Sequence, residues 1–197
     1  ACLAPLLAKA SRELPHLRVE PQVMGFEQLS DALRRGRVDM ALTWDLGLES
    51  SIARRELARV APQAVLPPDH HLAAHANLVL QDLTGQPLIL ANQGLSIGHM
   101  RALFAQKGLT MQIRYRTASL ELMRSYVANG LGIGLSYTHP ASQHSHDGKP
   151  VVLRPLQDAG TEPLILAHDR QNPLTNAAQA LAALLPCCLP QGLRTCC

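Results

Sequence analysis

The chain has 197 residues, of which 47% are hydrophobic, 17% charged and 3% aromatic, so a core of aliphatic side chains can form without disulfide staples. The formal charge of +3 is spread thinly, and the densest basic group, Arg34, Arg35 and Arg37, is typical of a solvated helix end. This distribution argues against a nucleic-acid interface, which needs a concentrated basic face. No apolar run approaches the ~18 residues of a membrane span, and no signal peptide opens the sequence.

The first part of the chain has the pattern of a helix followed by a β-α-β unit. Apolar residues at helical spacing predict helices over residues 3–14 and 26–33, and Gly36 ends the second one. Residues 17–23 alternate between apolar and polar, which predicts a half-buried strand at the edge or end of a sheet. Residues 38–43 form a second short apolar run, and the crossover between the two strands should be right-handed.

The same pattern recurs with different residues in the second half of the chain. Strands are predicted over residues 88–91 and 111–115, with a helix around residues 100–104 between them. A further helix over residues 120–127 leads into the glycine-rich run 131–135. We expect this run to be a central strand whose small face lets another element pack closely.

The remaining segments indicate how the two units are connected. Residues 60–66 link them, and strands over residues 151–153 and 164–167 precede an Ala- and Leu-rich helix over residues 174–185, capped by Thr175. If these last elements rejoin the first unit, the chain crosses between two subdomains twice. Such a double crossing makes a hinge around a cleft.

We therefore expect an α/β fold with two subdomains and a tail. The first subdomain comprises residues 1–64 and 140–185, the second comprises residues 65–139, and residues 186–197 form a flexible, cysteine-rich tail. Because the sequence starts at Ala1 rather than Met and runs directly into a helix, we expect it to be part of a longer protein.

Four loops that follow predicted strands are rich in Gly, Ser, Thr or Asn. Ligands of parallel sheets bind beyond the carboxyl ends of the strands, near the free N–H groups of helix N-termini, so these loops predict a site for a small anion such as a carboxylate. The same residue types also cap helices without any ligand, and for a single loop that explanation is equally good. Only the convergence of the four loops favours a binding cleft. The candidate residues are Gly25, Phe26, Thr43, Trp44, Asn92, Gln93, Ser96, Thr117, Ala118 and Ser119.

Two further side chains have two interpretations each. Trp44, the sole tryptophan, either walls a ligand or covers the core. Arg116 either pairs with a ligand carboxylate or points outward from its strand.

One motif indicates a different function. Gly94–Gly98 matches the G-x-S-x-G nucleophile elbow, in which Ser96 would be the nucleophile, and Asp158 and His168 follow in the order that an α/β-hydrolase uses. Two residues separate the motif from the preceding strand, and no His-Gly-Gly segment offers oxyanion donors. A serine hydrolase is therefore an alternative, and we expect no enzyme.

Clusters of histidines and cysteines raise the question of a metal site. His70, His71 and His75 share one loop, and His144 and His146 lie beside Asp147 in another, at spacings that can bind zinc or nickel. No matching set of carboxylates or cysteines accompanies them, and the tandem cysteines of the tail lack the two-residue spacer of zinc sites. We expect polar loops, with no metal and no cofactor.

The order of several residue runs resembles the LysR-type transcription regulators. Leu14–Val19 is similar to their early strand motif, and Leu33–Leu42 to their L-x-x-G-x-x-D-x-A-I segment. Asp69–Ala73 resembles a variant of their H-P-L-A turn, and Leu83–Leu90 their D-L-x-x-x-P-x-I segment. The longest match is Ser119–Leu135, which contains the run VANGLGIGL. The resemblance as a whole covers residues 1 to about 185.

The resemblance implies the effector-binding half of such a regulator. Its fold would be two Rossmann-like subdomains of the type-II periplasmic-binding-protein kind, with a double crossover hinge and a small-molecule effector in the cleft. It also implies a homodimer or tetramer in the cytoplasm, and contact with DNA only through a winged helix-turn-helix that would precede Ala1. A solute-binding protein of a transporter shares the fold and is the nearest alternative, although no export signal is visible.

Two departures from the family pattern affect the expected site. Ser136 and Tyr137 replace the usual Leu-Pro after the glycine-rich strand and add two hydroxyls near the hinge, so Tyr137 joins the candidate effector residues. The family's opening strand and its Ser- or Thr-bearing loop would precede Ala1. Part of the effector site is therefore expected to lie outside this sequence.

Overall fold

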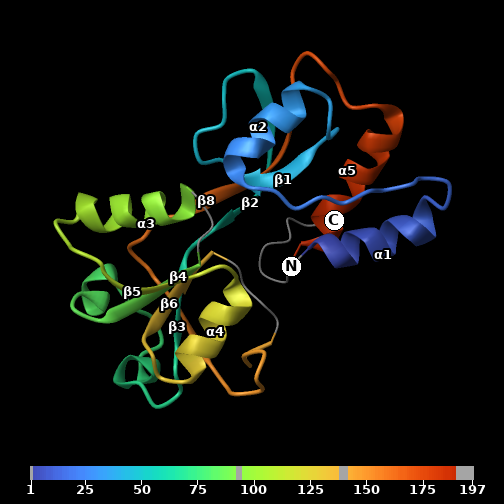
Figure 1. The fold of residues 1–197 in the computed structure, drawn as a ribbon. Coiled ribbons are helices and arrows are strands. Elements are labelled where there is room, and N and C mark those ends of the chain that lie inside the picture. Colours follow the sequence, from blue (N-terminus) through green and yellow to red (C-terminus); the bar gives the residue numbers. More distant parts are fainter. Residues whose placement is uncertain (1, 92–94, 138–141, 190–197) are drawn as a thin grey trace. The chain divides into compact units, whose positions relative to one another are not determined.

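The computed structural model describes residues 2–91, 95–137 and 142–189, without the side chains of residues 26, 27, 95 and 96. Contacts within the chain divide it into two compact units (Figure 1). Unit 1 comprises Ala1–Val60 and Glu162–Cys197, and unit 2 comprises Ala61–Thr161. The chain therefore passes from one unit to the other twice, as the sequence predicts.

Unit 1 is built on a three-stranded antiparallel sheet with helices packed against it. The strand order is β1-β8-β2, and both neighbouring pairs are antiparallel. The strands are β1 (Ala41–Trp44), β2 (Ile52–Val60) and β8 (Glu162–Asp169), and the helices are α1 (Leu3–Glu13), α2 (Phe26–Arg34) and α5 (Asn176–Cys188). Helices α1 and α5 lie side by side.

The strand predicted over residues 17–23 is wrong. These residues form no strand and pair with none of the described strands, and the side chain of Val23 is 94% exposed. A strand needs a neighbour for its N–H and C=O groups, and Pro21 has no N–H to donate. The first β-α-β unit is therefore absent from the described chain, and β1 pairs antiparallel with β8 instead.

The nine-residue strand β2 was not predicted, because its sequence breaks the alternation that marks a strand. Leu57 and Ala58 are adjacent and both buried, and the pairing with β8 shifts register between Glu56 and Ala58. This irregularity is a β-bulge, which places two consecutive side chains inward.

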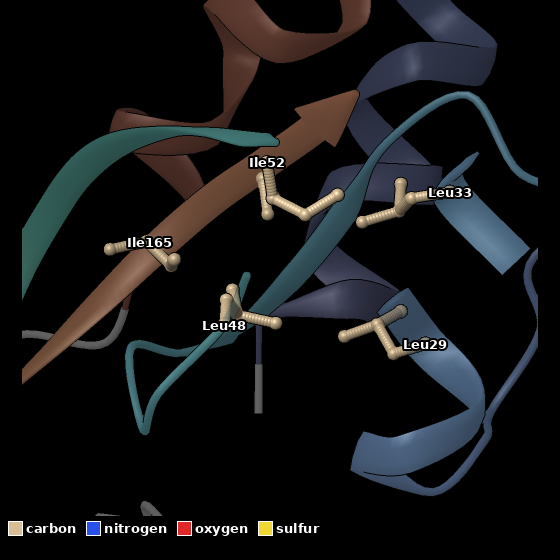
Figure 2. Packing of buried hydrophobic residues seen from close by; sticks show 6 residues of the cluster. Leu29, Leu33, Leu48, Ile52 and Ile165 are labelled. Atoms are coloured by element: carbon tan, nitrogen blue, oxygen red, sulfur yellow. The ribbon is translucent and has the colours of Figure 1, made fainter. Parts of the chain in front are cut away.

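The core of unit 1 joins α2 to the sheet. Leu29 and Leu33 of α2 pack in one buried cluster with Leu48, Ile52 of β2 and Ile165 of β8 (Figure 2). Leu48 comes from the loop between β1 and β2, so this loop is anchored in the core by its own side chain.

Helix α5 extends into the segment predicted to be a flexible tail. It continues through Pro186 to Cys188, and Cys188 and Leu189 are buried. Proline has no N–H for the carbonyl of Ala182 four residues earlier, and Arg55 of β2 donates to that carbonyl at 2.8 Å. The helix therefore passes the proline with an external donor. Residues 190–197 of the predicted tail lie outside the described residues.

Unit 2 is a five-stranded mixed sheet with the order β5-β4-β6-β3-β7. Its strands are β3 (Gln63–Leu66), β4 (Pro87–Ala91), β5 (Gln112–Thr117), β6 (Ile133–Ser136) and β7 (Val152–Pro155), and its helices are α3 (Leu95–Gln106), α4 (Leu120–Ala128) and the 3₁₀ turns η1 (His71–Ala74) and η2 (Leu80–Leu83). Strand β4 is parallel to β5 and to β6, whereas β3 is antiparallel to β6 and β7. The second predicted β-α-β-α-β pattern is confirmed.

The glycine-rich strand β6 is central and closely packed, as expected. A Cβ on Gly134 would lie 3.0 Å from the Sδ atom of Met123 on α4 and 3.2 Å from a methyl group of Val127. Helix α4 therefore approaches the sheet so closely that a side chain at position 134 would require Met123 and Val127 to shift.

Strand β7 changes the expected division of the chain. Residues 151–153 were expected to rejoin the first subdomain, but β7 pairs with β3 in unit 2. The second passage between units consequently lies at Thr161/Glu162 rather than at residues 139/140, and the first lies at Val60/Ala61 rather than at residues 64/65. Among the described helices, none has the length and apolarity to cross a membrane.

Candidate functional site

The carboxyl ends of the three parallel strands of unit 2 lie at one edge of its sheet. Ala91 at the end of β4 is opposite Thr117 at the end of β5, and the register of β4 with β6 places Ser136 beside Ala91 on the other side. Helices α3 and α4 begin just beyond this edge, at Leu95 and Leu120. The topology thus gathers three strand ends and two helix N-termini, whose free N–H groups favour an anion.

The predicted loop of Thr117, Ala118 and Ser119 lies at this edge. Thr117 is only 3% exposed, and its hydroxyl donates to the carbonyl of Ser119 at 2.9 Å. The hydroxyl oxygen of Ser119 accepts the backbone N–H of Leu122 at 3.2 Å, so Ser119 is the N-cap of α4. Capping, one of the two explanations considered for this loop, is confirmed. The Ser119 hydroxyl accepts this bond and still has its hydrogen to donate. Ala118, which lies between Thr117 and Ser119, is exposed.

Tyr137 follows β6 at the same edge and is 7% exposed. Its ring lies against the ring of His99 from α3, with centroids 5.9 Å apart and planes inclined at 50°. His99 was not identified from the sequence, because it lies inside a predicted helix among apolar residues. His99 lies within the first two turns of α3, which begins just after a strand end. Residues at such positions often face a ligand, so this position could have identified His99.

Unit 1 contributes the other described candidates. Gly25 is the N-cap residue of α2, with φ −70° and ψ 156°, and Phe26 is the first residue of that helix. Thr43 and Trp44 end strand β1 and are half-buried. The hydroxyl of Thr43 lies 3.4 Å from the carbonyl of Trp44. The half-buried indole leaves both interpretations of Trp44 open.

Three candidates of the glycine-rich loop cannot be placed in full. Asn92 and Gln93 lie outside the described residues, as does the side chain of Ser96, whose backbone belongs to the first turn of α3. Arg116 is exposed on β5, and its proposed pairing with a ligand carboxylate remains a prediction.

The residues that would complete a serine hydrolase triad have other partners. Asp158 accepts the backbone N–H of Leu80 at 2.9 Å and forms an ion pair with Lys107 at 2.8 Å. Burial would raise the pKa of Asp158, but Lys107 and the Leu80 N–H outweigh it and hold the pKa below its usual range. His168 belongs to unit 1, and its Nδ1 lies 2.8 Å from the carbonyl of Asp169.

His70, in the first histidine loop, contacts neighbouring residues of its own loop. The rings of His70 and His71 stack with centroids 4.4 Å apart, and the Nδ1 atom of His70 accepts the backbone N–H of Leu72 at 3.2 Å. Burial, together with the neighbouring His71, lowers the pKa of His70. Within the residues that the structure describes, no group of three or more His, Cys, Asp or Glu is placed to hold a metal ion.

Asp147, beside the second histidine pair, is engaged by α4. It accepts hydrogen bonds from the hydroxyl of Ser125 and the amide of Asn129, each at 2.9 Å. Hydrogen bonds from Ser145, Asn129 and Ser125 hold the pKa of Asp147 far below its usual range. This carboxylate therefore fastens residues 142–149 to α4.

Comparison with known proteins decides the family. The model of the LysR substrate binding domain matches residues 1–186. The chain belongs to this family. The resemblance seen in the sequence is thereby confirmed, and so is the periplasmic-binding-protein-like fold with two α/β units.

This LysR substrate binding domain is similar to parts of longer regulators. It is 31% identical over 167 residues to the HTH-type transcriptional regulator CatR of Pseudomonas putida, an alignment that covers 83% of the chain and 57% of CatR. It is 31% identical over 162 residues to the HTH-type transcriptional regulator cbl of Escherichia coli K12, covering 80% and 51%. The chain thus spans about half the length of the curated relatives it matches.

Solved structures share the fold of this LysR substrate binding domain. HinK, a LysR family regulator from Pseudomonas aeruginosa, is 30% identical with a TM-score of 0.87, covering 93% of the chain and 64% of HinK. The C-terminal domain of a probable LysR family regulator from Rhodococcus sp. RHA1 is 27% identical with a TM-score of 0.87, covering 93% and 91%. The BenM effector binding domain with its effector benzoate is 23% identical with a TM-score of 0.79, covering 94% and 84%, and shows the fold alone.

Proposed function

We propose that this LysR substrate binding domain binds a small organic acid as an effector, and that binding controls DNA binding and transcription by a longer protein. The observation that carries the proposal is the edge of unit 2, where Thr117, Ser136 and the N-termini of α3 and α4 come together. Two neighbours with this fold support the ligand class, because the BenM effector binding domain binds benzoate and the QuiR effector binding domain is in complex with shikimate. Both ligands are carboxylates.

The chemistry of the edge suits such a ligand. Backbone N–H groups at a helix N-terminus bind a carboxylate through hydrogen bonds and the helix dipole. The Ser119 hydroxyl, which accepts from Leu122, has its hydrogen left to donate. The rings of Tyr137, which follows β6, and His99 of α3 lie against each other and offer an aromatic surface with polar groups.

We propose that the effector also contacts candidate residues of unit 1, namely Gly25 and Phe26 at the start of α2 and Thr43 and Trp44 at the end of β1. An acid that binds one arrangement of the two units more tightly shifts the equilibrium toward it, by a coupling of about 1–3 kcal/mol.

The longer protein would act as a homodimer or tetramer in the cytoplasm. Contact with DNA would come only from a winged helix-turn-helix outside this chain. The domain would catalyse no reaction and need no cofactor, which separates it from a serine hydrolase that uses Ser96. A solute-binding protein of a transporter remains the alternative with the same fold.

The melting temperature of the chain in a panel of small carboxylic acids tests the proposal. An acid at 100 times its dissociation constant stabilises the folded state by about 2.7 kcal/mol, which raises the melting temperature of a chain of this size by roughly 5–10 °C. Ser119→Ala and Thr117→Val should reduce this rise. Thr175→Ala is the matched control, because Thr175 caps α5 in unit 1 and its loss should lower stability without changing the rise.

Two results would contradict the proposal. The first would be that no acid in a broad panel raises the melting temperature. The second would be an equal rise in the wild type and in Ser119→Ala. Labelling of Ser96 by a serine-directed phosphonate, with ester turnover that disappears in Ser96→Ala, would favour the hydrolase instead.

A further inference from the structure

The side chain of Arg54 binds the first part of the loop between β1 and β2, residues 45–51. Its Nε donates to the carboxylate of Asp45 at 2.9 Å. Its Nη2 donates to the carbonyls of Leu48 and Glu49, the latter at 3.2 Å. Its Nη1 donates to the carbonyl of Ile52 at 3.0 Å. One planar guanidinium thus reaches the start, the middle and the far end of the loop.

Other groups hold the rest of the loop. Arg170 donates from Nε to the carbonyl of Ser50 at 2.9 Å and from its backbone N–H to that of Ser51 at 3.0 Å, and the guanidinium of Arg34 pairs with the carboxylate of Glu49 at 3.8 Å. The backbone N–H of Asp45 donates to the carbonyl of Pro163 at 3.0 Å, which extends the pairing of β1 with β8 by one residue. Leu48 is buried against Leu29 and Leu33 of α2 (Figure 2). The path of residues 45–49 therefore depends on the apolar anchor Leu48, on the hydrogen bonds of Arg54 and on the exposed ion pair of Glu49, whereas Arg170 holds residues 50 and 51.

Arg54 differs from the other arginines of β2 in what it contacts. Its side chain is 26% exposed and it serves the loop, whereas that of Arg59 is 57% exposed and pairs with the carboxylate of Glu56 through two bonds of 3.1 Å. An exposed pair of the second kind contributes little to stability. A lysine cannot replace Arg54, because a single ammonium cannot span acceptors that lie on four residues.

The residue that this arrangement fixes is Trp44. It lies directly before Asp45, so a change in the Asp45–Arg54 ion pair acts on the backbone next to the indole. Leu48 connects the same loop to α2, whose N-terminus carries Gly25 and Phe26. Both candidate segments of unit 1 are thus joined through residues 45–51.

We propose that Arg54 is a positioning residue for effector binding, which fixes residues 45–49 and with them Trp44 in the conformation that a small carboxylate requires. The proposal rests on the function proposed above. Arg54 itself does not need to touch the ligand.

Because Trp44 is the only tryptophan, its fluorescence reports on the end of β1, directly before this loop. We would compare acrylamide quenching and anisotropy of Trp44 in the wild-type chain, Arg54→Met, Arg54→Lys and the matched control Arg59→Met, all below the melting transition. Ligand-free Arg54→Met should show stronger quenching and lower anisotropy, and Arg54→Lys should restore little of either. Arg59→Met should match the wild type, although it loses a guanidinium from the same strand.

Binding is measured on the same variants with benzoate and shikimate as probes. For a probe that the wild type binds, Arg54→Met should weaken the affinity about ten-fold, the factor that corresponds to roughly 1.4 kcal/mol. Asp45→Asn, which keeps an acceptor of the same shape, should have a smaller effect in the same direction.

Three outcomes separate the two proposals. Unchanged Trp44 quenching in Arg54→Met, or an equal change in Arg59→Met, overturns the role of Arg54. Altered quenching with unchanged affinity for a probe that binds shows a structural residue and overturns it too. If neither probe binds the wild type, the proposed ligand class loses its support, and Arg54 is judged by the ligand-free quenching alone.

Discussion

Replacing Arg55 with methionine tests the explanation of the proline inside α5. The carbonyl of Ala182, a residue buried against the core, lacks the N–H that Pro186 cannot supply and accepts instead from Arg55 at 2.8 Å. Arg55→Met keeps most of the apolar stem and removes the donor. We expect a loss of about 1–3 kcal/mol, the usual cost of a buried acceptor without a partner.

The same substitution in a Pro186→Ala background provides the decisive comparison. An alanine in place of Pro186 restores an N–H four residues after Ala182, so the helix satisfies its own carbonyl. Arg55→Met should then cost less than about 0.5 kcal/mol, which gives a coupling of about 1–2 kcal/mol between the two positions. Arg59→Met, on the same strand but paired only with Glu56, should have an effect below about 1 kcal/mol in both backgrounds.

Urea denaturation followed by far-UV circular dichroism measures the free energy of unfolding of each variant. At about 2–4 °C per kcal/mol, thermal melts of the same variants should show the difference as well. Equal costs of Arg55→Met in the wild-type and Pro186→Ala backgrounds would refute the reasoning. The hydrogen bond from Arg55 would then be incidental to the passage of α5 through the proline.

Further substitutions test unit 2. Gly132→Ala should destabilise the chain by about 3 kcal/mol, because the new Cβ would lie 2.3 Å from the carbonyl oxygen of Pro87; a urea midpoint equal to that of the wild type would contradict this packing. Asp158→Asn should lower stability at neutral pH and flatten its decline in acid. The ion pair with Lys107 holds the pKa of Asp158 below its usual range, so the ionised carboxylate stabilises the folded state at neutral pH, and this contribution is lost as the pH falls through the folded-state pKa. Urea midpoints of both proteins between neutral pH and about pH 3 check the sign. Parallel pH profiles of the wild type and Asp158→Asn would contradict it. Ser119→Ala should cost about 1 kcal/mol through loss of the α4 cap, and an unchanged melting temperature without ligand would show that the cap is redundant.

The elements that sequence analysis placed correctly are those whose signals are local. Helices α3 and α4 combine a helical period with a glycine or asparagine stop, and strands β4, β5 and β6 are short runs that are apolar, alternating or rich in glycine. The central position of β6 followed from its glycines, since a strand without side chains on one face must lie against something close. Thr117, Ser119 and Tyr137 lie at the ends of these elements, so their positions at one edge of the unit 2 sheet could be predicted from sequence, whereas their role in binding stays a prediction.

The errors concern pairing partners, which a local pattern does not contain. Residues 17–23 alternate as a strand does, but no described strand pairs with them. The bulge in β2 breaks the alternation that would have predicted this nine-residue strand. The four residues of β7 carry no pattern that indicates pairing with β3 rather than with a strand of unit 1. The hydrogen bonds of Arg54 and Arg55 were missed for the same reason. The carbonyl groups that accept these bonds come near the two arginines only in the folded chain.

The most direct test of the central claim is to map the amides that an effector perturbs. Two-dimensional NMR of the isotope-labelled chain would be recorded with the carboxylic acid that most raises its melting temperature. We predict shifts concentrated at residues 117–119 and 136–137 of unit 2 and at residues 43–45 of unit 1. Shifts confined to other surfaces, such as the exposed face of α1, would contradict the proposed site, because the acid would then stabilise the chain without reaching the strand ends.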